Sequence, residues 1–233
     1  MIAIIDYDAG NLKSVEKALA SLGEESVITR DRREILRADK VVLPGVGAFG
    51  DAMGKLHQYG LASVIREVAD GGTPFLGICL GLQLLFESSE ESPGVEGLGI
   101  CKGQILRIPR GYALCEADTH LAGSSVEAGA LPDGASVSEQ ARHEDLKIPH
   151  MGWNSLKFDH PGRLFAGIPE ESYVYFVHSY YLKAANPEIV TASTFYSVNI
   201  HASIEQGNVF ACQFHPEKSS RVGIAILKNF IDL

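Results

Sequence analysis

TPFLGICLGLQLLF, at residues 73–86, is the stretch that decides the fold of this chain. An apolar run leads to Gly77, a cysteine follows at Cys79, and a second glycine stands at Gly81. From there on, LGLQLLFESS has the pattern of a helix. The stretch therefore predicts a buried strand that turns sharply into a helix, with a thiol at the turn.

Strand-like and helix-like segments also alternate before this stretch. Short apolar or β-branched runs at 2–6, 26–29 and 40–45 predict strands. Amphipathic helical patterns occupy 11–23 and roughly 49–70. Such an alternation is typical of a parallel sheet that helices cover on both faces. We therefore expect an α/β fold with three layers, α/β/α, around a central and mostly parallel sheet.

Two glycine-containing turns follow strands of this predicted sheet. One is PGVG at 44–47, and the other is GICLG at 77–81. In doubly wound sheets, ligands bind at the carboxyl ends of the strands. The sequence thus predicts a functional site where these two turns meet.

The second half of the chain is richer in strands. Its strand-like segments, which are β-branched and aromatic, are ICKGQILRIP, GWNSLKF, SYVYFVHSYYL, EIVTASTFY, NIHASIE and NVFACQFHP. The last of them leads directly into EKSSRVGIAILKNFIDL, which has the pattern of an amphipathic helix. We find no internal repeat and no interdomain linker, so residues 1–233 are expected to form a single domain.

Composition and charge exclude several classes of protein. The formal net charge of −9 argues against binding nucleic acid through a phosphate-neutralising surface. No stretch approaches the roughly 18 apolar residues of a membrane span, and MIAIIDYDAGNL lacks the features of a secretory signal. The four cysteines have no CxxC spacing, which makes a zinc knuckle or a disulfide framework unexpected. We expect a cytoplasmic protein with reduced thiols, without metal or cofactor.

The segment at 111–145 differs in character from the rest of the chain. It holds seven acidic residues and one basic residue, and it is rich in Ala, Gly and Ser. This composition suits an exposed excursion better than a core. We therefore expect an acidic surface insertion at about 111–145.

Cys79 has two interpretations at this stage. A nucleophilic cysteine must ionise near neutral pH, be reachable, and face donors for the oxyanion that it creates. A strand-to-helix turn meets these needs, because it lifts the side chain out of the sheet and places it at a helix N-terminus. The alternative is a buried structural thiol, since free cysteine is among the most buried residue types.

QFHPEKSS, at 213–220, favours the nucleophile. It places His215 and Glu217 just past a predicted strand, with Pro216 fixing the backbone between them. The carboxylate can then hold the imidazole in one tautomer while the free ring nitrogen faces a thiol. The pattern predicts a triad of Cys79, His215 and Glu217.

At this point the sequence resembles a known family. GICLGLQ with QFHPEKS resembles the class I (triad) glutamine amidotransferases. A finer pattern resembles the glutaminase subunits of imidazole glycerol phosphate synthases, and its stretches are IIDYDAGNLKSV, LPGVGAFGDAM, GICLGLQLLFE, KIPHMGWN, YFVHSYY and QFHPEKSS. They follow one another in the family's order along the chain, and the last of them ends at residue 220. The resemblance implies the amidotransferase variant of a flavodoxin-like fold.

The resemblance also implies a chemistry and its residues. Cys79 would attack the side-chain amide of L-glutamine, forming a γ-glutamyl thioester and releasing ammonia. His215 would act as general base and acid, and Glu217 would orient it. The other implied site residues are Gly45, Val46, Gly47 and Leu80 at the oxyanion, and Gln83, Ser179 and Tyr180 around the glutamine. His178 is interpreted as structural.

A partner is implied as well. In this family the ammonia passes to a separate cyclase subunit, a (β/α)₈ barrel, which uses it in histidine biosynthesis. The two subunits would form a heterodimer. Asn11, Trp153 and Tyr175 match positions at that interface. Without the family, Trp153 fits a buried core position equally well.

Two departures from the family pattern concern the loops. Asp8 stands where glycine is most frequent in DYGxGN, but Asp tolerates a left-handed backbone better than most residues, so the loop is expected to survive. The segment at 111–145 is longer than the usual connection. It is either a passive surface loop or an acidic extension that contacts the partner.

Three rival functions follow from the same residues. The chain fits another class I amidotransferase subunit, but DYxxGN and PHMGWN favour the histidine pathway. A free-standing γ-glutamyl cysteine hydrolase shares the sheet and the triad, and it would be active alone. A non-catalytic module of this fold would need a broken triad, whereas Cys79, His215 and Glu217 are all present.

Overall fold

A sheet of seven strands forms the middle of the molecule, which we describe from a computed structural model, in the order β10-β11-β12-β4-β3-β1-β2. The strands are β1 (Ile2–Ile5), β2 (Ser26–Thr29), β3 (Lys40–Gly45), β4 (Phe75–Cys79), β10 (Val190–Tyr196), β11 (Val198–Gln206) and β12 (Val209–Cys212). From β2 to β12 the neighbours are parallel, in the order of flavodoxin-like sheets, and β11 and β10 add an antiparallel edge. The prediction of a mostly parallel sheet is confirmed.

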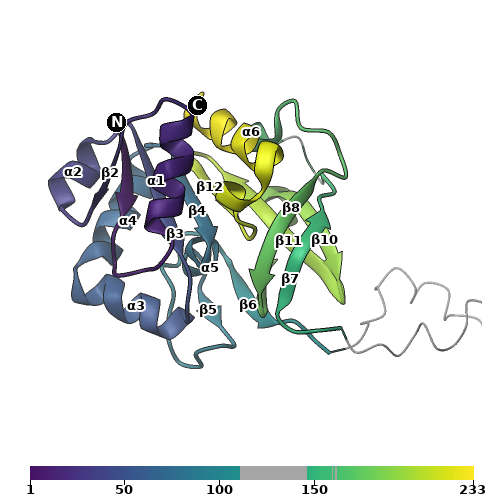
Figure 1. Ribbon diagram of the computed structural model, residues 1–233. Helices are drawn as coiled ribbons and strands as arrows, with labels where there is room; N and C mark the ends of the chain where they lie inside the picture. The colour runs from purple at the N-terminus through teal and green to yellow at the C-terminus, as the bar shows by residue number, and fades with distance from the viewer. Residues whose placement is uncertain (111–145, 159, 161) are drawn as a thin grey trace, which may run out of the picture.

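Helices cover both faces of this sheet, as Figure 1 shows. The larger ones are α1 (Leu12–Ser21), α2 (Arg32–Arg37), α3 (Phe49–Gln58), α4 (Leu61–Asp70) and α6 (Ser220–Ile231). Ile2 and Ile4 pack in one core with apolar residues of α1 and α6. Ala3 and Ile5, which point to the opposite face, pack in a second core with residues of α2, α3 and α4. Every residue of β1 is therefore buried, and the three-layer prediction is confirmed.

The helix predicted at roughly 49–70 is interrupted. The structure divides it into α3 and α4 at Tyr59 and Gly60, and Gly60 adopts the left-handed conformation with φ 66°. Glycine takes this conformation at little cost, so the chain changes direction there. The predicted helical stretch is confirmed, but two helices form it.

The helix after Cys79 is also shorter than predicted. α5 (Leu80–Leu84) has five residues, and the chain then pairs with a distant segment. The N–H groups of Ile100 and Cys101 both donate to the Leu85 carbonyl, at 2.9 and 3.0 Å. This backbone pairing replaces the helical hydrogen bonds. It leads into a second sheet of β5 (Ser88–Ser89), β6 (Gly103–Arg107) and β9 (Tyr180–Ala184).

The strand predicted within SYVYFVHSYYL consists of two strands that join different sheets. β8 (Tyr173–His178) pairs with β7 (His150–Ser155), whereas β9 pairs with β6. Ser179 is the junction between them. The described residues also include three short 3₁₀ helices, η3 (Arg163–Phe165), η4 (Pro187–Ile189) and η5 (Pro216–Lys218).

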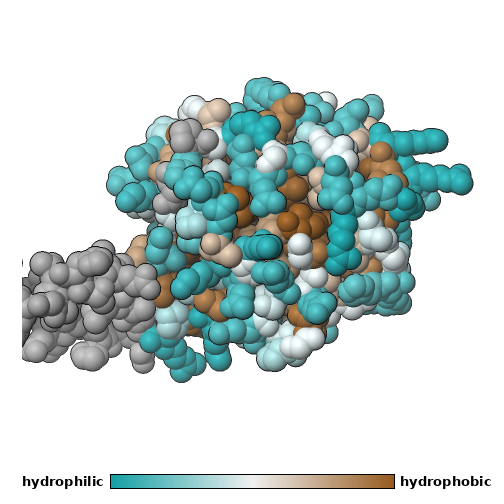
Figure 2. Space-filling view, turned by 180° about the vertical axis from the view of Figure 1, so that it is seen from behind, coloured by the Kyte–Doolittle hydropathy of each residue, from teal (hydrophilic) through white to brown (hydrophobic). Residues whose placement is uncertain are grey.

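The structure describes residues 1–110, 146–158, 160 and 162–233. The insertion predicted at about 111–145 therefore lies outside the described residues. On the face drawn in Figure 2, hydrophilic residues dominate and hydrophobic residues gather near the middle. None of the helices in the described ranges has the length and apolar character needed to cross a membrane.

Candidate active site

The turn from β4 into α5 holds Cys79 in an unusual backbone conformation. Cys79 has φ 54° and ψ −107°, outside the regions that most residues occupy. Two glycines allow the turn, because a Cβ at Gly81 would lie 1.8 Å from the Leu43 carbonyl oxygen and one at Gly77 would lie 2.9 Å from the Gly81 backbone. This is the geometry of a nucleophile elbow, which lifts a reactive side chain above a sheet edge.

Sheet register brings His215 to the same edge. β12 runs parallel to β4, with Cys212 opposite Ile78, so the residues that follow β12 emerge beside Cys79. The His215 amide donates to the Tyr175 carbonyl at 2.9 Å, and the Ser219 hydroxyl donates to the His215 carbonyl at 2.6 Å. The backbone around His215 is thus fixed by β8 and by the start of α6.

His215 and Glu217 form a buried pair. Nδ1 of His215 lies 2.8 Å from Oε1 of Glu217, and both side chains are fully buried. Burial alone would lower the pKa of His215, but the neighbouring Cys79 sulfur and the Glu217 carboxylate outweigh it and raise the pKa to about 9. Nε2 of His215 has no hydrogen-bond partner in the described part of the chain. The arrangement leaves that nitrogen free for proton transfer.

A cavity of about 350 Å³ opens beside Cys79. The lining comes mainly from the turn after β3, from the β4–α5 elbow, and from the end of β8 with the start of β9. It comprises Val46, Gly47, Cys79, Leu80, Gln83, Glu91, Pro149, Val177, His178, Ser179 and Tyr180. Six of the seven residues expected at the oxyanion or around the glutamine thus line one cavity. The exception is Gly45, which pairs with Cys79 in the sheet and packs against the Tyr7 hydroxyl.

The turn after β3 has a backbone that suits glycine. Gly47 has φ 113°, a conformation that L side chains rarely adopt. Val46, by contrast, leaves 39% of its surface exposed. The turn therefore forms one rim of the cavity.

Asn11 contacts the histidine and glutamate pair directly. Its Nδ2 donates to Oε1 of Glu217 at 2.6 Å, so this oxygen serves both Asn11 and His215. Asn11 itself is left-handed, with φ 78°. Asp8, in the same loop, is left-handed with φ 63°, and its carboxylate pairs with Arg30 at 2.7 Å. The expectation that this loop tolerates Asp8 is confirmed.

Comparison with known proteins agrees with this geometry. The family model "Glutamine amidotransferase class-I" matches residues 3–233. The imidazole glycerol phosphate synthase subunit HisH of Moorella thermoacetica is 48% identical over 232 residues, which cover 100% of this chain and 94% of that protein. The HisH subunit of Geobacillus sp. (strain WCH70) is 45% identical, with 100% and 97% covered. The chain belongs to the class I glutamine amidotransferases.

Solved structures agree on the fold of this class I amidotransferase. The structure of PurLQS from Thermotoga maritima superimposes with a TM-score of 0.67 at 18% identity, covering 99% of this chain and 97% of that one. At this identity the likeness concerns the fold alone. Within the described ranges of the amidotransferase, no group of three or more His, Cys, Asp or Glu side chains is placed to hold a metal ion.

Glu91 is a residue of the amidotransferase site that the sequence reasoning missed. Its side chain lines the cavity, and its Oε2 accepts a hydrogen bond from the Phe49 amide at 2.8 Å. It is one of four acids in FESSEESPGVE. Neither helical nor strand periodicity separates it from its neighbours, because the chain around it is irregular.

His178 and His150 form a second buried pair in the amidotransferase. Nδ1 of His150 lies 3.0 Å from Nε2 of His178, and Nδ1 of His178 lies 2.8 Å from the Tyr180 carbonyl oxygen. Burial lowers the pKa of His178 to about 3 and that of His150 to about 4. His178 was expected to be structural; it is buried, and it also lines the cavity.

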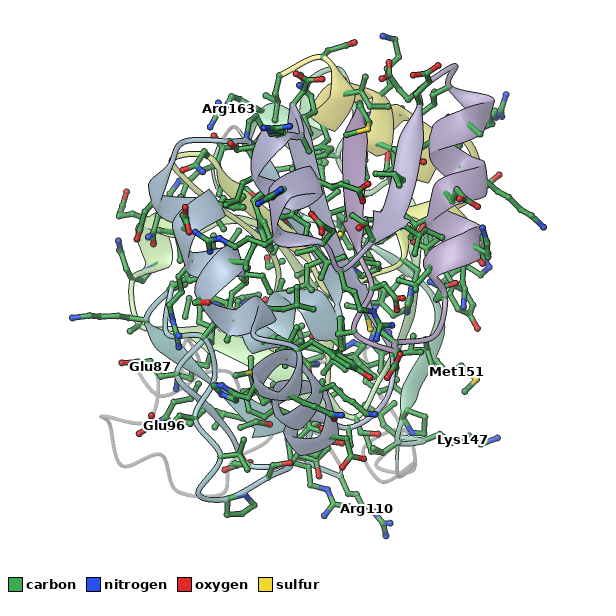
Figure 3. All side chains as sticks on the ribbon, turned by 90° about the vertical axis from the view of Figure 1, so that its left-hand side faces the viewer. Glu87, Glu96, Arg110, Lys147, Met151 and Arg163 are labelled. Carbon is green, nitrogen blue, oxygen red and sulfur yellow. The ribbon has the colours of Figure 1, made fainter. Side chains whose placement is uncertain are left out.

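Two of the three residues expected at a partner interface lie on neighbouring strands of the amidotransferase. Trp153 on β7 faces Tyr175 on β8, with ring centroids 6.0 Å apart. The side chain of Trp153 is 52% exposed, so its interpretation as a core residue is wrong. Met151, two residues earlier, is 62% exposed and points away from the molecule in Figure 3.

Proposed function

We propose that this chain is the glutaminase subunit of an imidazole glycerol phosphate synthase, hydrolysing L-glutamine to glutamate and ammonia. The observation that carries the proposal is the elbow cysteine beside a buried histidine and glutamate pair. Relatives named HisH, at 44–48% identity across this chain, support the choice of pathway. Cys79, His215 and Glu217 are the proposed triad.

The charge state of His215 sets the first step. With its pKa raised to about 9, His215 carries a proton at neutral pH, which favours a thiolate and imidazolium pair with Cys79. The thiolate attacks the amide carbon of glutamine. His215 then donates its proton to the departing nitrogen, so that ammonia leaves and a γ-glutamyl thioester remains. Glu217 keeps the ring oriented throughout.

Hydrolysis of the thioester restores the enzyme. Neutral His215 takes a proton from water, and the resulting hydroxide attacks the thioester carbon. The carbon–sulfur bond breaks, glutamate leaves, and the thiolate and imidazolium pair is regenerated. One glutamine and one water thus give one glutamate and one ammonia.

The cavity residues provide recognition and charge stabilisation. The backbone N–H groups of Gly45 to Gly47 and of Leu80 are the proposed oxyanion donors, since they flank Cys79 at the elbow. Gln83, Ser179 and Tyr180 hold the glutamine. Glu91 adds a carboxylate to the same cavity, and its second oxygen, Oε1, suits the α-ammonium group of the substrate.

The partner in this proposal is a cyclase subunit of (β/α)₈-barrel type, in a cytoplasmic heterodimer. Asn11, Trp153 and Tyr175 are its proposed contacts, and exposed Met151 extends the same surface. Exposed aromatic residues of this kind are frequent anchors of protein interfaces. Because Asn11 also binds Glu217, docking of the cyclase would act directly on the triad.

The test is glutamine hydrolysis by this chain alone, and then with the cyclase subunit and its ribulose-phosphate ligand. We expect weak activity alone and strong stimulation in the complex. High activity that ignores the partner would keep the Cys79 chemistry but make the protein a free-standing γ-glutamyl hydrolase. Stimulation by a different synthase subunit would move it to another amidotransferase pathway.

A further inference from the structure

We propose that Gln213 is a further functional residue of this site, whose side-chain amide donates a hydrogen bond to the Cys79 sulfur and stabilises the thiolate. The inference rests on the proposed function of Cys79 as the nucleophile. Gln213 lies between β12 and His215 and is fully buried. Its Nε2 is 3.7 Å from Sγ of Cys79, within range of an N–H to sulfur bond.

The orientation of the Gln213 amide is fixed by a chain of hydrogen bonds. The Tyr180 carbonyl oxygen can only accept, so Gln83 presents Nε2 to it, at 3.2 Å. The second proton on Nε2 of Gln83 goes to Oε1 of Gln213, at 3.0 Å. With its oxygen so occupied, Gln213 must turn its NH₂ group toward Cys79. The Tyr180 carbonyl therefore determines, through Gln83, that Gln213 presents an N–H donor to the sulfur.

The histidine pair strengthens the start of this chain. His178 donates its Nδ1 proton to the same Tyr180 carbonyl, which requires the Nδ1–H tautomer. Its Nε2 then accepts the Nδ1 proton of His150. The network therefore continues from Cys79 into β7, the strand that carries Trp153.

The two sides of the sulfur then have different partners. His215 approaches Cys79 as an imidazolium that exchanges a proton, whereas Gln213 is a neutral donor that never titrates. Sγ also lies 4.0 Å from the Val177 carbonyl oxygen, which accepts from the thiol but not from the thiolate. A hydrogen bond from Gln213 is stronger to the charged sulfur than to the neutral one. Gln213 therefore raises the fraction of Cys79 that is ready to attack.

The test is the rate at which iodoacetamide alkylates Cys79, measured on the peptide that contains it. Gln213→Met keeps the length of the side chain and removes the donor. We expect alkylation about 10- to 100-fold slower at pH 7, the range for a lost hydrogen bond to a charged group. At pH 10, which is above the ordinary range for a cysteine thiol, the rate should return to within about threefold of wild type. A merely structural role would not produce this dependence on pH.

Two further variants keep the proposal falsifiable. Gln213→Glu retains the acceptor for Gln83 and the shape of the side chain, and it should slow alkylation at least as much, because a carboxylate repels the thiolate. Ser203→Ala is the matched control. Ser203 is equally buried and donates to the Ala211 carbonyl on β12, away from the cavity, so its loss should leave alkylation unchanged.

Steady-state kinetics of the complex provide a second, independent test of Gln213. For Gln213→Met we expect kcat for glutamine hydrolysis to fall by about 10-fold or more, with KM changed by less than about threefold. Unchanged alkylation at pH 7 in both Gln213 variants would overturn the proposal. If the wild-type complex does not hydrolyse glutamine, the proposed function fails, but the alkylation result still decides the role of Gln213.

Discussion

Two pairs of buried side chains in this molecule contain histidine, and the histidine pKa is shifted in opposite directions in the two pairs. His215 is fully buried against Glu217, and its pKa rises to about 9. His178 and His150 are buried against each other, and their pKa values fall to about 3 and about 4. The first pair can hold and transfer a proton at neutral pH, whereas the second stays neutral.

The difference shows that the partner of a buried histidine, rather than burial itself, decides its role. Burial disfavours the imidazolium in both pairs. At His215 a carboxylate and the Cys79 sulfur outweigh that effect. At His178 the neighbours are a backbone carbonyl and a second imidazole, which do not compensate for the lost hydration. In the neutral pair, each histidine is instead fixed in one tautomer, and His178 binds the Tyr180 carbonyl beside Ser179.

The largest expected effect on activity comes from replacing His215, the histidine of the charged pair. His215→Asn removes the proposed general acid and base, so glutamine hydrolysis in the complex should fall by roughly 10³-fold or more. Steady-state ammonia release measures it. The matched control is His57→Asn, which removes an exposed imidazole from α3 and should leave turnover unchanged. Retained turnover in His215→Asn would contradict the proposed role of His215 in proton transfer.

The free energy of unfolding at acid pH tests the neutral pair, His150 and His178. His150 and His178 have a lower pKa when folded than the 6.5 of a free imidazole, so the unfolded chain binds their protons first. Their contribution is complete above pH 6.5, and it is lost as the pH falls toward about 4 for His150 and about 3 for His178. At pH 5 the lowered pKa of each histidine reduces the free energy of unfolding by about 2 kcal/mol.

Urea unfolding of wild type and His150→Gln, at pH 7.5 and pH 5, measures this contribution. Glutamine does not titrate, so the variant should lose less stability than wild type between the two pH values. The measurement at pH 7.5 serves as the control for any general damage to packing. An identical loss in both proteins would contradict the buried neutral pair.

A smaller effect is expected at Asn11, the polar neighbour of the charged pair. Asn11→Ala removes one hydrogen bond from Oε1 of Glu217 but leaves the bond to His215, so kcat should fall by about 3- to 10-fold. Lys13→Ala, an exposed change on α1, is the control. Turnover in the complex, measured with saturating cyclase, separates this effect from weakened docking. No change in kcat would show that Glu217 needs no second donor.

Much of this architecture could be predicted from the sequence, because its signals are local. The strands at 26–29 and 40–45 have the bounds that apolar patterning predicted. The position of Cys79 between two glycines, and the short spacing from His215 to Glu217, indicated the site from sequence patterns alone. These features depend on residues that lie close together along the chain.

The features that prediction missed depend on distant contacts. α5 ends early because the chain just after it bonds to residues near 100, which helical periodicity cannot reveal. Glu91 reaches the cavity from an irregular segment. The His150 and His178 pair joins β7 to β8, and the Gln213 network joins β12 to the Ser179 junction. No pattern within one segment indicates such pairs.

Trapping the covalent intermediate tests most directly whether Cys79 is the nucleophile. The complex is mixed with glutamine, quenched in acid within one turnover, and digested for peptide mass mapping. We expect a γ-glutamyl group on the peptide that contains Cys79, and none in Cys79→Ser. Burial raises the pKa of Cys101 to about 12, which makes that thiol unreactive under these conditions. A γ-glutamyl group on any other residue, or turnover that persists in Cys79→Ser, would contradict that role of Cys79.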